Sequence, residues 1–218
     1  MEEFVAKLRG DHSEFNKGKS LDDRIKSTDP MLLFKKWYKE AFERNCSEPH
    51  AMFLSTVNAE MQPSTRTVYM KELLEEGIIF YTNYESQKAT EINTNPKVSV
   101  LFYWDCLERQ VRINGVAEKA PAELSDDYFA SRPRGSQLGA WASAQSKAIQ
   151  SREELEASLE VVTKRFEGKE VPRPQFWGGY LIRPEYLEFW QGRPKRLHDR
   201  ICFTRVSKDE WDVHRKNP

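Results

Sequence analysis

The segment Trp190–Arg200 carries the side chains whose chemistry is easiest to interpret, and it reads WQGRPKRLHDR. If its second half is extended, successive side chains alternate, and Arg196, His198 and Arg200 share one face. An arginine fork suits phosphate or carboxylate, and histidine changes protonation near neutral pH. The segment therefore predicts a pocket for a phosphate and a ring, although a solvated basic edge strand fits the same pattern equally well.

Two other segments have the residue types of an anion site. Ser86-Gln87-Lys88 stands where a helix is expected to begin, so free backbone N–H groups and a lysine there could hold a phosphate. Serine is also a common helix cap, which is the simpler interpretation. Arg66 and Lys71 stand at the two ends of one expected strand, which puts them on opposite faces unless a bulge intervenes.

Two further groupings are weaker. Gln110 and Arg112 share a strand face opposite Val111, and solvent exposure is the favoured explanation for that polar face. Tyr128 lies on a helix that leads into the arginine- and serine-containing segment 131–136. That segment combines phenol, guanidinium and hydroxyl donors, but a loop of this composition is usually plain surface.

The overall charge makes any anion site a local one. The 218 residues contain 34 basic and 34 acidic side chains, so the net field favours neither nucleic acid nor an anionic membrane. A hydrophobic content of 39% with 12% aromatic residues supports one globular core. No apolar run is long enough for a membrane span, and the acidic start lacks the features of a signal peptide. We expect a cytoplasmic protein.

The three cysteines, Cys46, Cys106 and Cys202, are widely separated. Their number and spacing match neither a disulfide framework nor a metal site, and we interpret them as ordinary thiols in a reducing compartment. No metal is expected.

The elements that must position these residues are mostly strands. Residues 1–27 have too few apolar side chains to pack and predict a mobile N-terminal arm. Asp29 and Pro30 then begin an amphipathic helix that ends near Asn45. Shorter helices are expected at 86–93 and 121–130 and a longer one at 151–166. The period of two predicts strands at 51–57, 64–71, 77–82, 97–104, 107–118, 179–182, 186–190, 200–205 and 211–214.

Consecutive strands with few helices between them imply antiparallel pairing. We predict a mainly β fold with peripheral helices, an antiparallel barrel of Greek-key type, formed by a single domain over residues 28–218.

Taken together, the motifs resemble the pyridoxine 5′-phosphate oxidase family, the flavin mononucleotide (FMN) enzymes of vitamin B6 metabolism. The resemblance runs from Asp29-Pro30 to the end of the chain. It rests on ordered segments at 66–71, 80–83, 86–89, 109–111, 131–133, 139–141, 145–146, 177–179, 188–192 and 196–200.

The resemblance implies a split-barrel flavoprotein, a homodimer with FMN at the subunit interface. It also implies roles for individual residues. The implied flavin contacts are Arg66, Thr67, Tyr81, Thr82, Gln87, Lys88, Gln110, Gln145, Ser146, Trp190 and Arg200. The implied substrate contacts are Lys71, Tyr128, Arg132 and Ser136 at the phosphate, with Arg196 and His198 over the pyridine ring as the catalytic pair.

The reaction implied is the oxidation of pyridoxine or pyridoxamine 5′-phosphate to pyridoxal 5′-phosphate. Oxygen is the implied electron acceptor and gives hydrogen peroxide, and the amine substrate also gives ammonia. Neither Arg196 nor His198 can be assigned as a base from sequence. Two alternatives stay open: a flavin reductase of the same fold, and a carrier that delivers pyridoxal phosphate to apoenzymes as a second activity.

Two positions depart from the family pattern. Gln87 stands where the family usually has arginine, which replaces a charged bond to the flavin phosphate by a neutral one. The chain ends Arg215-Lys216-Asn217-Pro218, where the family commonly ends Arg-Leu-Ala-Pro, so apolar packing of the tail is lost.

Overall fold

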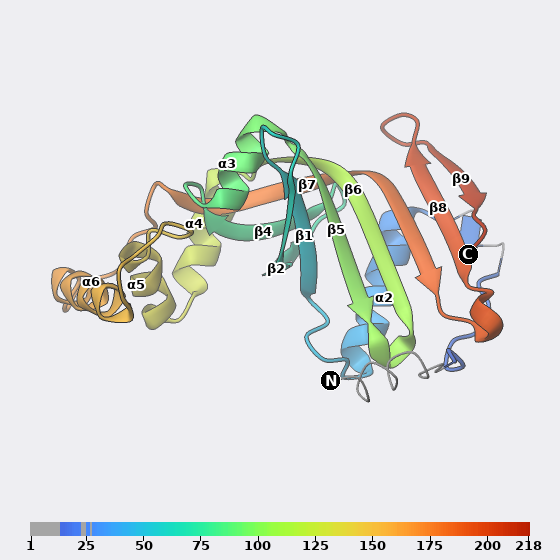
Figure 1. Cartoon of the computed structure of the whole chain (residues 1–218), viewed down its shortest axis with the longest axis horizontal. Coiled ribbons are helices and arrows are strands. Elements are labelled where there is room, and N and C mark those ends of the chain that lie inside the picture. Colours follow the sequence, from blue (N-terminus) through green and yellow to red (C-terminus); the bar gives the residue numbers. More distant parts are fainter. Residues whose placement is uncertain (1–13, 23–24, 27) are drawn as a thin grey trace, which may run out of the picture. The chain divides into compact units, whose positions relative to one another are not determined.

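The computed structural model describes residues 14–22, 25–26 and 28–218 (Figure 1). Part of the predicted N-terminal arm, at 1–13, 23–24 and 27, therefore lies outside the described residues. Within the described part, Leu21 is buried and its N–H donates to Asp199 Oδ2 at 3.0 Å. The backbone N–H of Lys17 donates to Glu108 Oε2 at 2.8 Å. The mobility of the arm stays a prediction.

Strands dominate the described residues, and five α-helices and two short 3₁₀ helices accompany them. The helices are α2 (Pro30–Glu43), α3 (Gln87–Thr94), α4 (Ala122–Ser131), α5 (Arg134–Ala142), α6 (Arg152–Arg165), η2 (Asp105–Leu107) and η3 (Pro194–Arg196). The strands are β1 (Ala51–Val57), β2 (Pro63–Tyr69), β3 (Glu72–Leu73), β4 (Ile78–Asn83), β5 (Lys97–Trp104), β6 (Arg109–Lys119), β7 (Trp177–Gln191), β8 (Asp199–Arg205) and β9 (Trp211–Arg215).

The strands hydrogen-bond in the order β2-β1-β5-β6-β7-β4-β3, and β8 and β9 continue from β7. β1 and β2 form an antiparallel pair from Ala51↔Tyr69 to Val57↔Pro63. β4 pairs with the first half of β7, and β8 pairs with its second half, both antiparallel. The mainly antiparallel β fold predicted from the sequence is confirmed.

Local sequence signals predicted some elements correctly and missed others. Asp29 caps α2 by accepting from the N–H groups of Met31 and Leu32, as its position before Pro30 predicts. The two strands predicted at 179–182 and 186–190 are one continuous strand, β7, which runs through Pro184. Helix α5 was not predicted, because its two glycines and the preceding Pro133 resemble a loop.

The chain divides into two compact units. The first unit consists of the residues up to Pro49, 101–113 and 186–218, and the second consists of 50–100 and 114–185. The predicted single-domain boundary stays a prediction.

Aromatic side chains build the core of each unit. In the first unit the rings of Trp37 and Phe189 lie 5.2 Å apart, and Phe203 follows at 5.6 Å from Phe189. In the second unit Phe129 and Trp177 belong to a buried cluster under helices α4, α5 and α6. Burial of such rings supplies much of the free energy that holds each unit folded.

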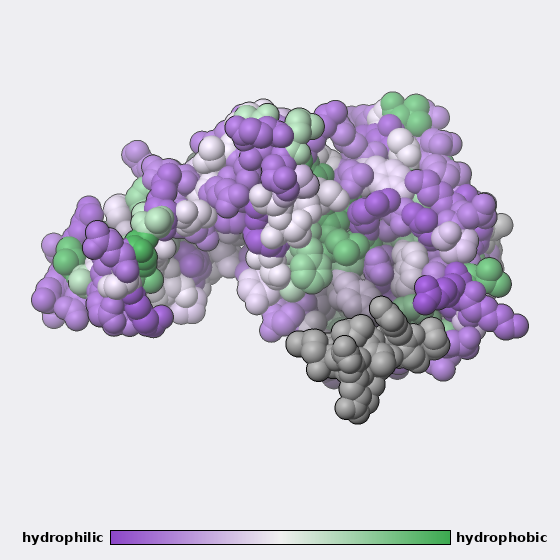
Figure 2. Space-filling view, viewed as in Figure 1, coloured by the Kyte–Doolittle hydropathy of each residue, from purple (hydrophilic) through white to green (hydrophobic). Residues whose placement is uncertain are grey.

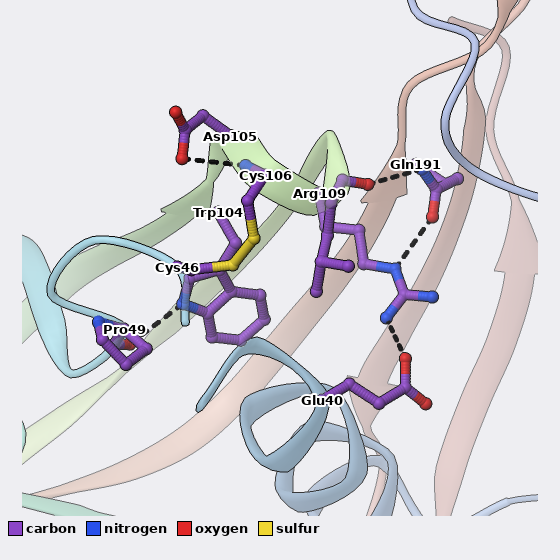
Figure 3. Close-up of a disulfide and its surroundings, with 9 residues drawn as sticks. Glu40, Cys46, Pro49, Trp104, Asp105, Cys106, Arg109 and Gln191 are labelled. Atoms are coloured by element: carbon purple, nitrogen blue, oxygen red, sulfur yellow. Dashed lines mark hydrogen bonds and ion pairs between the residues drawn. A yellow bond between two sulfur atoms is a disulfide. The ribbon is translucent and has the colours of Figure 1, made fainter. Parts of the chain in front are cut away.

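The first unit contains a disulfide between Cys46 and Cys106 (Figure 3). The interpretation of all three cysteines as thiols is therefore wrong for this pair, and Cys202 is the free, buried cysteine. The fold places the two Cα atoms 5.6 Å apart although 60 residues separate them in sequence. Beside them, the Trp104 indole N–H donates to the Pro49 carbonyl at 2.9 Å.

Hydrophilic residues cover most of the face shown in Figure 2, and apolar residues form smaller separate groups on it. None of the helices in the described part of the chain is both long enough and apolar enough to span a membrane.

Candidate functional site

The second unit contains a cavity of about 410 Å³ that collects nine of the predicted site residues. We call it the cationic pocket. Its lining residues are Arg66, Thr67, Val68, Tyr69, Lys71, Tyr81, Thr82, Lys88, Tyr128, Arg132, Gln145 and Trp177.

A break between two strands brings Arg66 and Lys71 to the same pocket. β2 ends at Tyr69, and the Met70 N–H turns to donate to the His50 carbonyl at 2.9 Å. The Lys71 N–H then donates to the Ile79 carbonyl at 2.8 Å. Because the strand stops between the two cations, the opposite-face argument, which assumed one strand through Lys71, does not apply.

Aromatic rings form one wall of the pocket and support Arg132. The Tyr81 and Tyr128 rings stack at 4.1 Å, and Trp177 stacks on Tyr81 at 5.5 Å. The Arg132 guanidinium lies 4.7 Å from the Trp177 ring centroid. Its Nη1 is buried and has no hydrogen-bond partner among the described residues. Burial lowers the pKa of Arg132, but an arginine remains charged, so this atom is a donor prepared for an anion.

Lys88 is the most buried cation of the pocket. Its Nζ donates to Thr82 Oγ1 at 3.2 Å and to Ser86 Oγ at 3.4 Å. Burial lowers its pKa to about 8, and the positive charge of Arg66 acts in the same direction. Gln145 completes this end, because its Oε1 accepts from Thr82 Oγ1 at 3.0 Å. The lysine charge is therefore sensitive to mildly alkaline pH.

Arg66 is held from beneath by buried groups. Its Nη1 donates to the Leu54 carbonyl at 3.2 Å and to Thr56 Oγ1 at 2.5 Å. Its Nη2 lies 3.4 Å from Oε2 of Glu91, whose side chain is only 6% exposed. Since Nη1 already has two partners, the guanidinium is fixed largely independently of the longer contact to Glu91.

Three residues predicted for this site lie elsewhere in the second unit. Gln87 and Ser146 line a different cavity, of about 320 Å³. The Gln87 side-chain amide donates to Glu91 Oε1 at 2.9 Å and to Ser64 Oγ at 3.2 Å. Ser136 is exposed in the first turn of α5 and is not among the residues that line the cationic pocket.

The remaining predicted residues belong to the first unit. The predicted strand at 200–205 is confirmed as β8, but the extended conformation considered for 196–200 is absent from its first half. Pro194–Arg196 forms the 3₁₀ helix η3, and Lys195 and Arg196 have positive φ angles of 57° and 60°. β8 begins at Asp199. Arg196, His198 and Arg200 therefore do not alternate as in a strand, because the backbone at Lys195 and Arg196 is left-handed and not extended.

His198 is fixed through its Nδ1, which accepts from the Arg193 N–H at 3.1 Å. Its ring lies 4.7 Å from Trp190 and 5.5 Å from Phe15. Burial lowers the pKa of His198, and the charge of Arg196 lowers it further. Both effects favour the neutral ring, and a neutral ring whose Nδ1 accepts carries its proton on Nε2.

Arg200 is held by the buried carboxylate of Glu188, at 3.2 Å from Nε and 2.9 Å from Nη2. Its Nη1 donates to the Asn217 carbonyl at 3.0 Å. The Lys216 N–H donates to the Arg200 carbonyl at 3.0 Å. Polar contacts therefore hold the C-terminal tail, which lacks the apolar residues of the family pattern. Gln110 lies half-buried in β6.

Sequence reasoning assigned no role to Trp177, Glu91 or Glu188. Trp177 lies in a segment that carries the family resemblance, which could have indicated a pocket wall. Glu91 follows Gln87 by four residues on a helix, a spacing that predicts contact. Glu188 also lies in a segment that carries the resemblance, but its arginine partners, Arg200 and Arg112, are 12 and 76 residues away, so its ion pairs could not be predicted.

Among the described residues, no group of three or more His, Cys, Asp or Glu side chains is arranged to hold a metal ion.

A mainly antiparallel β fold with a cationic, aromatic-walled pocket defines a protein equipped to bind an anionic ligand. Comparison with known families is more specific. Residues 38–166 match the family model described as pyridoxamine 5′-phosphate oxidase. Residues 177–218 match the pyridoxine 5′-phosphate oxidase C-terminal dimerisation region. The chain belongs to the pyridoxine/pyridoxamine 5′-phosphate oxidase family of oxidoreductases.

Two relatives show how far the likeness extends. The pyridoxine/pyridoxamine 5′-phosphate oxidase of Rubrobacter xylanophilus is 55% identical over 177 residues, which is 81% of this chain and 82% of the relative. That of Gloeothece citriformis is 43% identical over 218 residues, which is 100% of both chains.

Two solved structures share the fold. PhzG from Burkholderia lata 383, in complex with tetrahydrophenazine-1-carboxylic acid, has a TM-score of 0.85 and 27% identity, and the match covers 93% of this chain and 100% of that one. A pyridoxamine 5′-phosphate oxidase-related, FMN-binding protein from Nostoc punctiforme has a TM-score of 0.68 and 18% identity over 92% of this chain and 100% of that one. The predicted split-barrel class is confirmed.

Proposed function

We propose that this chain oxidises pyridoxine 5′-phosphate and pyridoxamine 5′-phosphate to pyridoxal 5′-phosphate with FMN as cofactor. Oxygen accepts the electrons and gives hydrogen peroxide, and the amine also releases ammonia. The observation that carries the proposal is the buried Arg132 Nη1 in the cationic pocket of a chain from this family. Relatives at 43–55% identity bear the oxidase name, whereas the PhzG chain is 27% identical, which favours B6 vitamers as substrates.

The residues of the pocket fit a phosphorylated flavin and a phosphorylated substrate. Four cationic side chains line the pocket: Arg66, Lys71, Lys88 and Arg132. Phosphate groups need several positive donors, and planar rings pack on aromatic side chains such as Tyr81. When bound, FMN supplies the two-electron acceptor for the oxidation.

The chain contributes placement and charge to the reaction. Lys71, Tyr128 and Arg132 hold the substrate phosphate, so binding energy at this handle orients the reacting carbon. Ser136 remains a proposed phosphate contact, although it lies outside the lining of the pocket. His198, neutral and protonated at Nε2, donates a hydrogen bond to the substrate. The positively charged Arg196 covers the pyridine ring of the substrate.

The dimerisation region carries four of the eight predicted site residues that do not line the cationic pocket. Trp190, Arg196, His198 and Arg200 all lie within 177–218. We propose a homodimer with FMN at the interface, in which this region completes the site together with Gln110. Thr67, Thr82 and Gln145, which line the pocket, remain proposed flavin contacts, and so do Gln87 and Ser146, which line the smaller cavity.

A cytoplasmic location and delivery of pyridoxal phosphate to apoenzymes belong to the same proposal. Both agree with a cofactor-producing role, because the product is a reactive aldehyde that is used by other enzymes.

Anaerobic titration tests the reaction. We expect the protein to purify yellow and to lose its flavin absorption on addition of pyridoxine 5′-phosphate, with recovery and one peroxide per turnover when air is admitted. Free pyridoxine is the matched control, because it lacks the phosphate handle. A colourless protein that retains no flavin after incubation with FMN contradicts the proposal. Equal bleaching of the flavin by pyridoxine 5′-phosphate and by free pyridoxine contradicts it as well.

A further inference from the structure

Glu91 is a buried carboxylate at the edge of a cation cluster, and the proposed reaction gives it no role. It lies in α3 and is 5% exposed. Thr56 Oγ1 donates to its Oε2, Ser64 Oγ donates to its Oε1 at 3.3 Å, and Gln87 Nε2 donates to its Oε1 at 2.9 Å. Burial raises the pKa of this carboxyl, but these donors and Arg66 together hold it below its usual value, so the group is ionised.

The negative charge of Glu91 acts on Arg66 and Lys88, the two cations proposed to bind the flavin phosphate. Arg66 Nη2 lies 3.4 Å from Oε2, and the charge of Glu91 raises the pKa of Lys88 against the effect of burial. The cluster of Arg66, Lys88 and Glu91 therefore presents one net positive charge instead of two. A dianionic ligand is attracted by the cations and repelled by the carboxylate.

Glu91 also determines where the side chain at position 87 points. Residues four apart on a helix are neighbours, and the Gln87 amide is directed to Glu91 and Ser64. Gln87 consequently lines the smaller cavity and not the cationic pocket.

We propose that Glu91 is a specificity-determining residue that weakens binding of the flavin phosphate, by offsetting the charge of Arg66 and by retaining the side chain at position 87. This inference rests on the proposed FMN site. The charge of Glu91 is not required to hold Arg66, because Leu54 O and Thr56 Oγ1 accept from the guanidinium and the amide oxygen of a glutamine at position 91 can still accept from Thr56 Oγ1. Neutralising Glu91 therefore strengthens binding of a phosphorylated flavin at about pH 6, where Lys88 keeps its charge without the carboxylate, and leaves riboflavin, which lacks the phosphate, unchanged.

The test is flavin titration of apo-protein with FMN and riboflavin in parallel at about pH 6, followed by flavin fluorescence. Glu91→Gln keeps the size of the side chain and removes its charge. We expect its Kd for FMN to fall about three- to tenfold and its Kd for riboflavin to stay within about twofold. Glu160→Gln, at an exposed position of α6, is the control for net charge, and we expect it to change neither constant.

A second pair of variants separates retention of position 87 from the charge effect. Gln87→Arg in the wild-type background places an arginine that pairs with Glu91, so its gain in FMN affinity is small. In the Glu91→Gln background the same arginine is free to reach the phosphate, and the gain is about tenfold. The two gains differ, whereas independent sites would give equal ones.

An unchanged or lower ratio of riboflavin Kd to FMN Kd in Glu91→Gln, with thermal melting at the wild-type temperature, overturns the inference and leaves the proposed function intact. Should Glu91→Gln unfold, the single variants Gln87→Arg and Gln87→Lys replace it as the test. If both have wild-type stability and both gain about tenfold in FMN affinity, Glu91 does not retain the side chain at position 87, and the inference is overturned as well. A wild-type chain that binds neither flavin overturns the proposed function itself.

Discussion

The cationic pocket and the 190–200 segment both contain arginines, but they use them differently. In the pocket, Arg132 has a buried nitrogen without a partner among the described residues and is supported by an aromatic ring. In the segment, Arg200 is paired with Glu188, and Arg193 lies 3.9 Å from Asp199. A cation supported by a ring keeps its charge for a ligand, whereas a cation paired with a carboxylate offers position and hydrogen-bond geometry instead. Of these three arginines, Arg132 is therefore the one whose charge is left for a ligand.

The largest effect is expected from removing Arg132, one of the two arginines of the pocket. Arg132→Leu deletes a charged contact to the substrate phosphate, and we expect kcat/KM for pyridoxine 5′-phosphate to fall about hundredfold or more. Steady-state peroxide assays with phosphorylated and free pyridoxine measure it. If Arg132→Leu lowers both substrates equally, the arginine does not recognise phosphate.

In the other region, Arg196→Ala and His198→Ala should each lower turnover about ten- to hundredfold while FMN remains bound. The reason is that both residues are proposed to contact the substrate ring, whereas the flavin contacts are assigned to other side chains. Activity and bound flavin are measured in the same samples. Near-normal turnover in both variants contradicts the division of roles.

A smaller effect is expected from pH. Lys88 has a pKa of about 8 in the free protein, so it is charged below that pH and loses its charge as the pH rises through it. Arg66 opposes the lysine charge, Glu91 favours it, and Thr82 and Ser86 accept its hydrogen bonds. We expect FMN affinity to fall about five- to tenfold between about pH 7 and pH 9.

Lys88→Met is the control for this pH effect. We expect it to bind FMN weakly and with a flat profile over the same range. A profile in the variant that is as steep as in the wild type assigns the effect to another group.

The smallest effect is expected at the tail. Deleting residues 217–218 removes the carbonyl that accepts from Arg200 Nη1, while Glu188 retains Nε and Nη2. We expect FMN affinity to fall about two- to threefold, the loss of one hydrogen bond of modest strength. Asn217→Ala keeps the carbonyl and is the matched control, so an equal loss in both variants excludes this explanation.

How much of this could be predicted from the sequence differs between the two regions. Period and capping signals located α2 and most strands within a few residues, because they depend on local chemistry. The resemblance selected nine residues that line one cavity. The arrangement at Lys195 and Arg196 could not be predicted, since two consecutive left-handed residues other than glycine depend on contacts that sequence does not display. The orientation of Gln87 depended on Glu91, a partner that the motif does not include.

The covalent link between Cys46 and Cys106 closes a chain segment that includes Arg66, Lys71, Tyr81 and Lys88. With 60 residues in the loop, the chain-entropy model assigns the closed form about 4 kcal/mol of extra stability. The heat resistance of the protein should therefore follow the thiol content of its surroundings. Reduction of the disulfide should lower the melting temperature of the protein although no residue of the pocket changes.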